Sequence, residues 1–229
     1  MPDPVKCLAV NTASKALSLA ITAGEQILHL FETPEMRDQG NVLLRHIQSG
    51  LAQNNLTFFD LDLLAVVTGP GSFTGIRAGL AAMRGIALAA DKPLIGMSSF
   101  DMFAVSAAGS VNIVAVESWR EELYFAVLDE EGHPLLECMN ETPAVFFQRV
   151  HQHFPVDGHI VISGDAAQAV APFFPQAMIT AKAANAVDVA HKALQTFKSG
   201  RAFAKPVPYY LREADVTVSP HVSKTLREA

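Results

Sequence analysis

The 229-residue sequence predicts an α/β protein built from two similar halves, each with a mixed β-sheet. Three observations lead to this prediction. Apolar residues make up 50% of the chain, which is enough to fill a sizeable core. Each half opens with short apolar segments separated by turns and continues into helical segments. The segments follow the same order in both halves, the second being shorter, which indicates an internal duplication.

The first half begins with three predicted strands, over residues 7–13, 16–24 and 25–32, with Gly24 as the turn between the last two. They are followed by a predicted helix over residues 41–55, for which Asn41 is the expected N-cap. Four apolar side chains repeat at helical spacing in this segment: Leu43, Leu44, Ile47 and Leu51.

The rest of the first half contains two more predicted strands and two helices. Residues 61–69 are continuously apolar, as is typical of a strand covered on both faces. The glycine-rich turn GPGSFTG leads into a helix over about residues 75–90, with Thr74 as the expected N-cap. After the short strand PLIGM, Ser98 and Asp101 have the spacing of a capping box for a helix that we expect Gly109 to end.

The second half repeats this order in a shortened form. Residues 112–135 are again read as strand, turn, strand, turn and strand. Thr142 and Pro143 predict the start of a helix. Residues 158–170 are read as a strand, a Gly-Asp turn and a helix start, which parallels LLAVVTGPGSFTG. Residues 185–199 predict the last helix, with Asn185 as its cap.

Duplicated halves of this type form the architecture shared by actin, sugar kinases and Hsp70, the ASKHA or ribonuclease H-like fold. Two mixed sheets flank a cleft in that architecture, and turns from both halves point into it. We therefore expect an N-terminal lobe over residues 1–108 and a C-terminal lobe over residues 109–229. The last helix, residues 185–199, is a candidate to pack back onto the first lobe.

Charge and composition argue against several classes of protein. A net charge of −6, from 17 basic and 23 acidic residues, is not expected of a protein that binds nucleic acid on its own. Cys7 and Cys138 form no metal-type or disulfide-type pattern, which fits a reducing cytoplasm. The N-terminus lacks a signal-peptide pattern, and no stretch approaches about 18 uninterrupted apolar residues. The expected location is the cytoplasm, without membrane contact.

Three segments resemble the TsaB (YeaZ) family, and the likeness covers nearly the whole chain: LAVNTASKALSLAI, GPGSFTGIRAGLAAMRGIALAADKPLIGMSSF and YLREADVT. The resemblance implies a bacterial protein needed for threonylcarbamoyladenosine, the modified base beside the anticodon of certain tRNAs. It implies that a separate synthase makes threonylcarbamoyl-adenylate and that a larger paralogue, TsaD, transfers the group to tRNA. The chain itself would be a non-catalytic dimerisation partner of TsaD, and a small ATPase, TsaE, would dock on the pair. Any tRNA contact would come through that complex.

The residues that a catalytic relative would need are missing or altered. The metal site of the paralogue needs two histidines one helical turn apart, and none of the eight histidines has a partner at that spacing, so we predict no metal. The first strand of this fold normally ends in an acidic residue, and many family members have Asp-Thr there. This chain has Asn11-Thr12, and an amide supplies no carboxylate to Mg²⁺. The sequence also lacks a Gly-x-Ser-x-Gly elbow, so a peptidase-like hydrolase gains no support.

The glycine-rich turn is nevertheless a candidate nucleotide loop. Its glycines permit a close backbone approach, and a helix start attracts anions. It lacks the lysine of a P-loop, so it predicts no kinase or ATPase site, although an ATPase or phosphotransferase remains the alternative reading. Three interpretations stay open: a plain strand-to-helix turn, a weak ATP or ADP contact without any other cofactor, and a partner contact. The candidate residues are Asn11, Thr12, Gly69, Gly71, Ser72, Thr74 and Gly75.

The helix after this turn is the candidate partner surface. Small residues lie along one side of it, namely Ala78, Ala81, Ala82, Gly85 and Ala89. A stripe of small side chains lets another helix approach closely, although an ordinary buried helix would also explain it. We expect the interface, in a homodimer of the free chain or in a complex with the paralogue, to use these residues: Leu43, Leu44, Ile47, Leu51, Leu80 and Met83, with Arg45, Arg77 and Arg84 at the rim.

Overall fold

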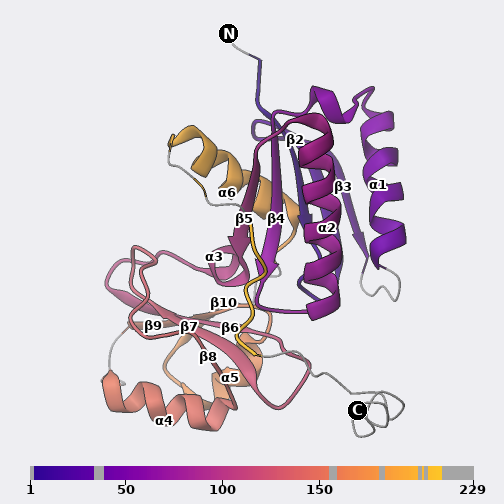
Figure 1. Ribbon diagram of the computed structural model, residues 1–229. Helices are drawn as coiled ribbons and strands as arrows, with labels where there is room; N and C mark the ends of the chain where they lie inside the picture. The colour runs from indigo at the N-terminus through magenta and orange to yellow at the C-terminus, as the bar shows by residue number, and fades with distance from the viewer. Residues whose placement is uncertain are drawn as a thin grey trace, which may run out of the picture.

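The computed structural model describes residues 3–33, 39–154, 159–180, 184–200, 203 and 206–212. It contains two five-stranded mixed sheets, one above the other in Figure 1. The first sheet has the strand order β3-β2-β1-β4-β5. Its strands are β1 (Lys6–Asn11), β2 (Leu17–Ala23), β3 (Gln26–Thr33), β4 (Leu63–Gly69) and β5 (Leu94–Ser98).

The second sheet repeats the topology of the first. Its order, β8-β7-β6-β9-β10, matches β3-β2-β1-β4-β5 strand for strand. In both sheets the first three strands pair antiparallel and the last two add on in parallel. The predicted duplication and fold class are confirmed. The strands are β6 (Ser110–Val116), β7 (Leu123–Leu128), β8 (Met139–Glu141), β9 (His159–Ser163) and β10 (Met178–Thr180).

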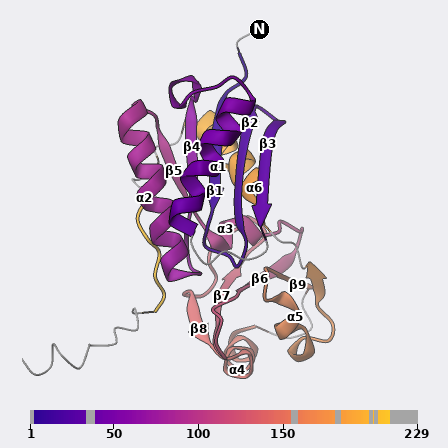
Figure 2. The same cartoon turned by 90° about the vertical axis from the view of Figure 1, so that its right-hand side faces the viewer.

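Helices cover both faces of the first sheet. Helices α1 and α2 lie on one face and α6 on the other, as Figures 1 and 2 show from two sides. Because β4 is covered on both faces, all seven of its residues are buried. The elements are α1 (Gln39–Gln53), η1 (Phe58–Asp60), α2 (Phe73–Ala90), α3 (Ser99–Phe103), α4 (Pro143–His153), α5 (Ala167–Val170), η2 (Ala171–Phe173) and α6 (Ala186–Lys198).

The two sheets share one core. Along β6 the side chains alternate, so that Val114 and Val116 join the core of the first sheet, whereas Ile113 and Ala115 face α4 and α5. Helix α6 follows the second sheet in the sequence but packs on β1 and β2, where the Ala186 amide donates to the Ser18 hydroxyl at 2.9 Å. The first half therefore buries one face of its sheet with a helix from the other end of the chain.

Several predicted element boundaries are wrong. Helix α1 begins at Gln39, before the expected cap Asn41. The capping box of Ser98 and Asp101 is present, but α3 ends at Phe103 because Ala104 leaves the helical conformation, well before Gly109. The third strand of the second sheet is β8 rather than a segment before residue 135. A turn after β7 places this strand later in the sequence. Asp129 closes the turn, since its carboxylate accepts hydrogen bonds from the amides of Glu131 and His133.

Residues 206–212, which we call the strap, run between β5 and α2 (Figure 1). The Tyr209 amide donates to the Thr68 carbonyl of β4 at 2.8 Å, and the Tyr209 ring meets the Phe100 ring edge-on at 6.3 Å between centroids. A Cβ on Gly96 would come closer than 3.0 Å to Pro206, so the glycine makes room for the strap. No helix among the described residues is both long and apolar enough to cross a bilayer.

Candidate functional site

The glycine-rich loop between β4 and α2 is bonded to the turn that follows β1. The Thr12 hydroxyl donates to the Gly75 carbonyl at 2.7 Å, and the Ser72 amide donates to the Ala13 carbonyl at 2.7 Å. The Ser72 hydroxyl accepts from the Gly75 amide at 3.2 Å, so Ser72 is the N-cap of α2. The prediction of Thr74 as the cap is wrong, since Thr74 lies exposed in the first turn of the helix.

Close backbone packing within the chain accounts for the glycines of this loop. A Cβ on Gly71, whose φ is 153°, would lie closer than 3.0 Å to the Ala13 carbonyl. A Cβ on Gly69, whose φ is 107°, would lie 2.8 Å from the Tyr209 carbonyl of the strap. Gly79 lies in the second turn of α2, and a Cβ there would lie closer than 3.0 Å to the Thr12 hydroxyl. These positions are filled by protein backbone and side chains.

The second half contains the same arrangement. Gly164, after β9, has a φ of 109°, and its Cβ would collide with the Ala115 carbonyl near the end of β6. The Ala166 amide donates to that carbonyl at 3.2 Å, as the Ser72 amide does to Ala13. A contact that recurs in both halves is a feature of the duplicated fold. It therefore needs no ligand to explain it.

Asn11 is buried at the end of β1, with 4% of its surface exposed. Its amide nitrogen donates to the Ser14 hydroxyl at 2.8 Å and to the Ala184 carbonyl at 3.1 Å. Its amide oxygen accepts from the Ala13 backbone amide at 3.0 Å. A carboxylate could not donate either of the first two bonds. Asn11 thus joins the first turn to the segment that leads into α6.

The space between the two lobes at this point is nearly filled. The cavity there has a volume of about 10 Å³, roughly the room needed for one water molecule. Asp165, which follows β9, points to it from the second lobe and accepts from the Glu117 amide at 2.9 Å. Asp165 is exposed as a residue, and partial desolvation of its carboxyl group is the main cause that raises its pKa. The lining residues are Asn11, Ala13, Ser14, Val67, Ser99, Met102, Phe103, Val116 and Asp165.

Most of the expected partner surface is buried instead. Helices α1 and α2 turn their large apolar side chains toward the first sheet, which leaves them no surface to offer a partner. The prediction that these residues form an interface is therefore wrong for the following five, each at most 3% exposed: Leu43, Ile47, Leu51, Leu80 and Met83. Leu44 is 42% exposed and does lie on the surface.

The small residues of α2 form the exposed side. Together with α1 and η1 they line an apolar groove of about 350 Å³, which we call the α1–α2 groove. A Cβ on Gly85 would meet nothing within 4 Å, and Phe59 on the rim is 70% exposed. The lining residues are Leu44, Gln48, Phe58, Phe59, Ala81, Ala82, Gly85, Ile86, Ala89 and Ala90. Phe58 and Phe59 were not predicted as part of a surface, although two adjacent aromatic residues in a polar connection are a usable signal.

Two of the expected rim arginines hold the strap. The Arg77 guanidinium lies 3.7 Å from the centroid of the Phe73 ring, and its Nε donates to the Tyr210 hydroxyl at 3.1 Å. Arg84 donates to the Pro206 carbonyl through Nε, at 3.1 Å, and through an Nη. Both arginines are exposed, so their assignment to the rim of a partner surface stays a prediction. Arg45 is exposed on α1. The strap was missed because a proline-rich tail gives no periodic signal.

One group with the geometry of metal ligands occurs in the part of the chain that the structure describes. It consists of Asp129, Glu131 and His133, in the turn after β7. The Asp129 carboxylate already accepts two backbone amides there and lies 3.3 Å from His133 Nδ1, and these bonds lower its pKa although desolvation opposes them. Glu131 and His133 are exposed, and turn closure accounts for the cluster.

Comparison with known proteins gives matches to a family model and to curated sequences. A model of the family described as TsaD: tRNA N6-adenosine threonylcarbamoyltransferase matches residues 35–206. The tRNA threonylcarbamoyladenosine biosynthesis protein TsaB of Escherichia coli is 32% identical over 134 residues, which is 56% of this chain and 58% of that protein. The protein of the same name from Haemophilus influenzae is 33% identical over 54% of each chain. The matches thus span a little more than half of these curated relatives.

A solved structure shares the fold. YeaZ from Pseudomonas aeruginosa superposes with a TM-score of 0.72 at 21% identity, covering 90% of this chain and all of that one. Together with the repeated strand order, this likeness identifies the two-lobe ASKHA-like fold. The α1–α2 groove is open and exposed, whereas the cleft between the lobes is nearly filled. The groove is therefore the candidate functional site.

Proposed function

Because this chain belongs to the family of tRNA N6-adenosine threonylcarbamoyltransferase, TsaD, and within it to the TsaB (YeaZ) group, we propose that it acts in making N6-threonylcarbamoyladenosine in tRNA. Its proposed role is that of a non-catalytic subunit that binds a larger TsaD-type paralogue. The paralogue carries out the transfer and contacts the tRNA. A TsaE-like ATPase docks on the pair, and a threonylcarbamoyl-adenylate synthase supplies the substrate.

The observation that carries this proposal is the α1–α2 groove. Ala81, Gly85 and Ala89 leave the α2 backbone open to a close approach, and the aromatic side chain of Phe59 stands beside them. An apolar surface that is poor in charge and contains aromatic anchors is typical of the centre of a protein interface. A helix of the paralogue laid along this groove would bury it. In the free chain, a second copy would use the same face to form a homodimer.

The interlobe cleft supports a non-catalytic role. Its cavity of about 10 Å³ cannot hold a nucleotide, and the side chains of Asn11 and Thr12 already bond within the chain. We propose that the chain needs no metal or cofactor of its own. The rival function, an ATPase or phosphotransferase, would require this cleft to open. It predicts turnover of ATP by the isolated chain that is lost when Asn11 is replaced.

Complex formation with the TsaD-type paralogue of the same organism tests the proposal. We expect size-exclusion chromatography with light scattering to give a mass equal to the sum of the two chains. Ala81→Glu should weaken the complex at least tenfold, because it places a charge in the groove. Ala144→Glu alters an exposed alanine on α4 and should leave binding unchanged. A wild-type mixture without complex contradicts the role, and full binding by Ala81→Glu contradicts the surface.

A further inference from the structure

The strap touches both lobes. Figure 1 shows it in yellow, running from the first sheet toward the second. Its middle residue, Tyr209, meets the Phe100 ring of the first lobe edge-on. Burial, followed by the neighbouring Cys138 thiol, raises the pKa of the Tyr209 hydroxyl. Cys138 lies directly before β8, so the strap joins α2 and β4 of the first lobe to the second sheet.

The first sheet is shaped to receive the strap. The ladder between β4 and β5 has an irregularity at Thr68, whose carbonyl accepts from the Tyr209 amide at 2.8 Å. A Cβ on Gly69 would lie 2.8 Å from the Tyr209 carbonyl. A Cβ on Gly96 would lie 2.6 Å from the Cβ of Pro206. An irregular ladder and two glycines therefore form a fitted seat for this segment.

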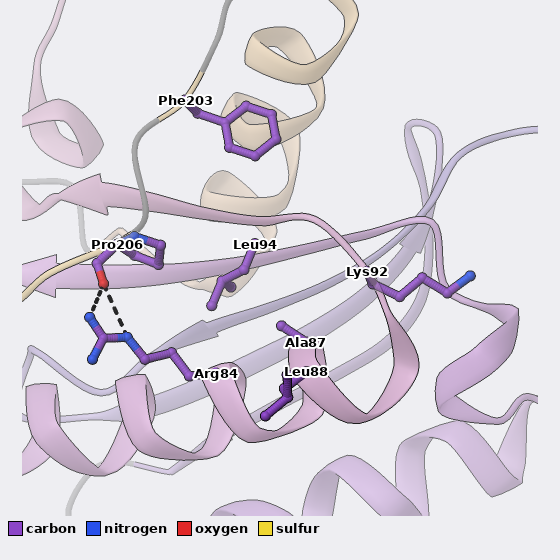
Figure 3. Close-up of a pocket in the computed structure, with 7 residues that line it drawn as sticks. All are labelled: Arg84, Ala87, Leu88, Lys92, Leu94, Phe203 and Pro206. Atoms are coloured by element: carbon purple, nitrogen blue, oxygen red, sulfur yellow. Dashed lines mark hydrogen bonds between the residues drawn. The ribbon is translucent and has the colours of Figure 1, made fainter.

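The bonds that hold the strap in its seat are nevertheless few. Between described residues, the bond to the Thr68 carbonyl is the one backbone-to-backbone hydrogen bond of the strap. The remaining polar contacts come from two exposed arginines of α2, and both acceptors are uncharged: Arg77 donates to the Tyr210 hydroxyl, and Arg84 to the Pro206 carbonyl (Figure 3). Val207 is 63% exposed. A segment with so few ladder bonds opens at a low cost in free energy.

We propose that the strap is a releasable clasp between the two lobes, which leaves its fitted seat and returns to it as one unit while the rest of the chain stays folded. When it is closed, it ties α2 and β4 to the second lobe. When it is open, Arg77 and Arg84 lose their acceptors and Cys138 loses its cover. Pro206 and Tyr209 are three residues apart, a reach of about 10 Å at most, so loosening one end of the clasp also frees the other.

The two cysteines of the chain provide separate readouts of local release and of global unfolding. Cys138 is partly buried beside Tyr209, so its reaction with a thiol reagent should follow the open fraction of the clasp. Cys7 is fully buried in β1, and loss of water raises the pKa of its thiol to about 12. It therefore stays protonated and unreactive as long as the first sheet is intact.

Reaction of the full-length chain with N-ethylmaleimide, followed by peptide mass spectrometry of each cysteine, tests this inference. Arg84→Ala removes the bonds to the Pro206 carbonyl without altering Cys138 or Tyr209. We expect it to speed the reaction of Cys138 about fivefold or more, because charge-assisted hydrogen bonds are lost. Gly96→Ala drives a methyl group into the seat of Pro206 and should speed that reaction about tenfold. Cys7 should stay unreacted in both variants.

Arg45→Ala is the matched control, since it removes an exposed arginine from α1, and Cys138 should react in it at the wild-type rate. Three results would overturn the inference. A wild-type rate at Cys138 in Arg84→Ala would show that the strap does not move as a unit. A wild-type Cys138 that reacts as fast as the same cysteine in an unfolded peptide would show that the strap does not cover it. An equal rise at Cys7 would show that the whole chain unfolds.

Discussion

Gly71 and Gly85 lie in the same glycine-rich stretch but meet opposite surroundings. The Cβ position of Gly71 is occupied by the Ala13 carbonyl, and its φ of 153° is one that other residues rarely adopt. Gly85 has ordinary helical geometry within α2, with open space at its Cβ position. The sequence shows both as glycines and cannot distinguish a backbone contact from an open surface. The difference arises because the fold packs the turn after β1 against Gly71 and leaves Gly85 uncovered.

Replacing each glycine with alanine should change stability in opposite directions. Gly71→Ala should lower the free energy of unfolding by about 2 kcal/mol or more, because the strained φ and the collision with Ala13 add. Gly85→Ala should raise it by about 0.5–1 kcal/mol, the usual gain in a helix interior. Urea denaturation measures both. A neutral Gly71→Ala would mean that the loop is free to move away from the β1 turn, as a ligand-binding loop would be.

At the scale of elements, the apolar periodicity of α1 and α2 correctly predicted two helices. Their apolar faces were, however, predicted to contact a partner protein rather than the first sheet. The repeat of large apolar residues correctly indicated helices with one apolar face. That face covers the helix's own sheet, and the small residues form the exposed side. The periodicity of a sequence gives the position of each residue around the helix axis. It does not indicate which neighbouring element packs against the apolar face. Strand β10 and the strap escaped prediction because their positions depend on tertiary contacts.

Two leucines eight residues apart on α2 provide a test at this scale. Leu80 is 2% exposed and Leu88 is 86% exposed. Leu80→Ala should reduce the free energy of unfolding by about 2–5 kcal/mol, since it leaves a cavity against the sheet. Leu88→Ala should change it by less than about 0.5 kcal/mol. Thermal and urea denaturation of both variants measure this difference in the free energy of unfolding. Similar decreases for the two variants would contradict the orientation of α2.

At the scale of the molecule, the two halves are similar in topology but not independent in their packing. The first sheet is covered on one face by α6, which comes from the far end of the chain. One face of the second sheet belongs to the same core as the first sheet. The duplicated order of elements could be predicted because both halves have the same local pattern. The exchange of a helix between halves depends on contacts more than 160 residues apart, such as that between Ser18 and Ala186.

The shared core predicts that both lobes unfold together. Trp119, the single tryptophan of the chain, lies in the turn between β6 and β7 and reports on the second lobe, whereas far-UV circular dichroism reports on all helices and strands. We expect the two signals to give one coincident urea transition. Ala190→Glu places a charge in the fully buried contact of α6, so it should lower both midpoints together. If the dichroism midpoint falls while the Trp119 transition stays in place, the second lobe folds on its own. In that case α6 is not what joins the two halves.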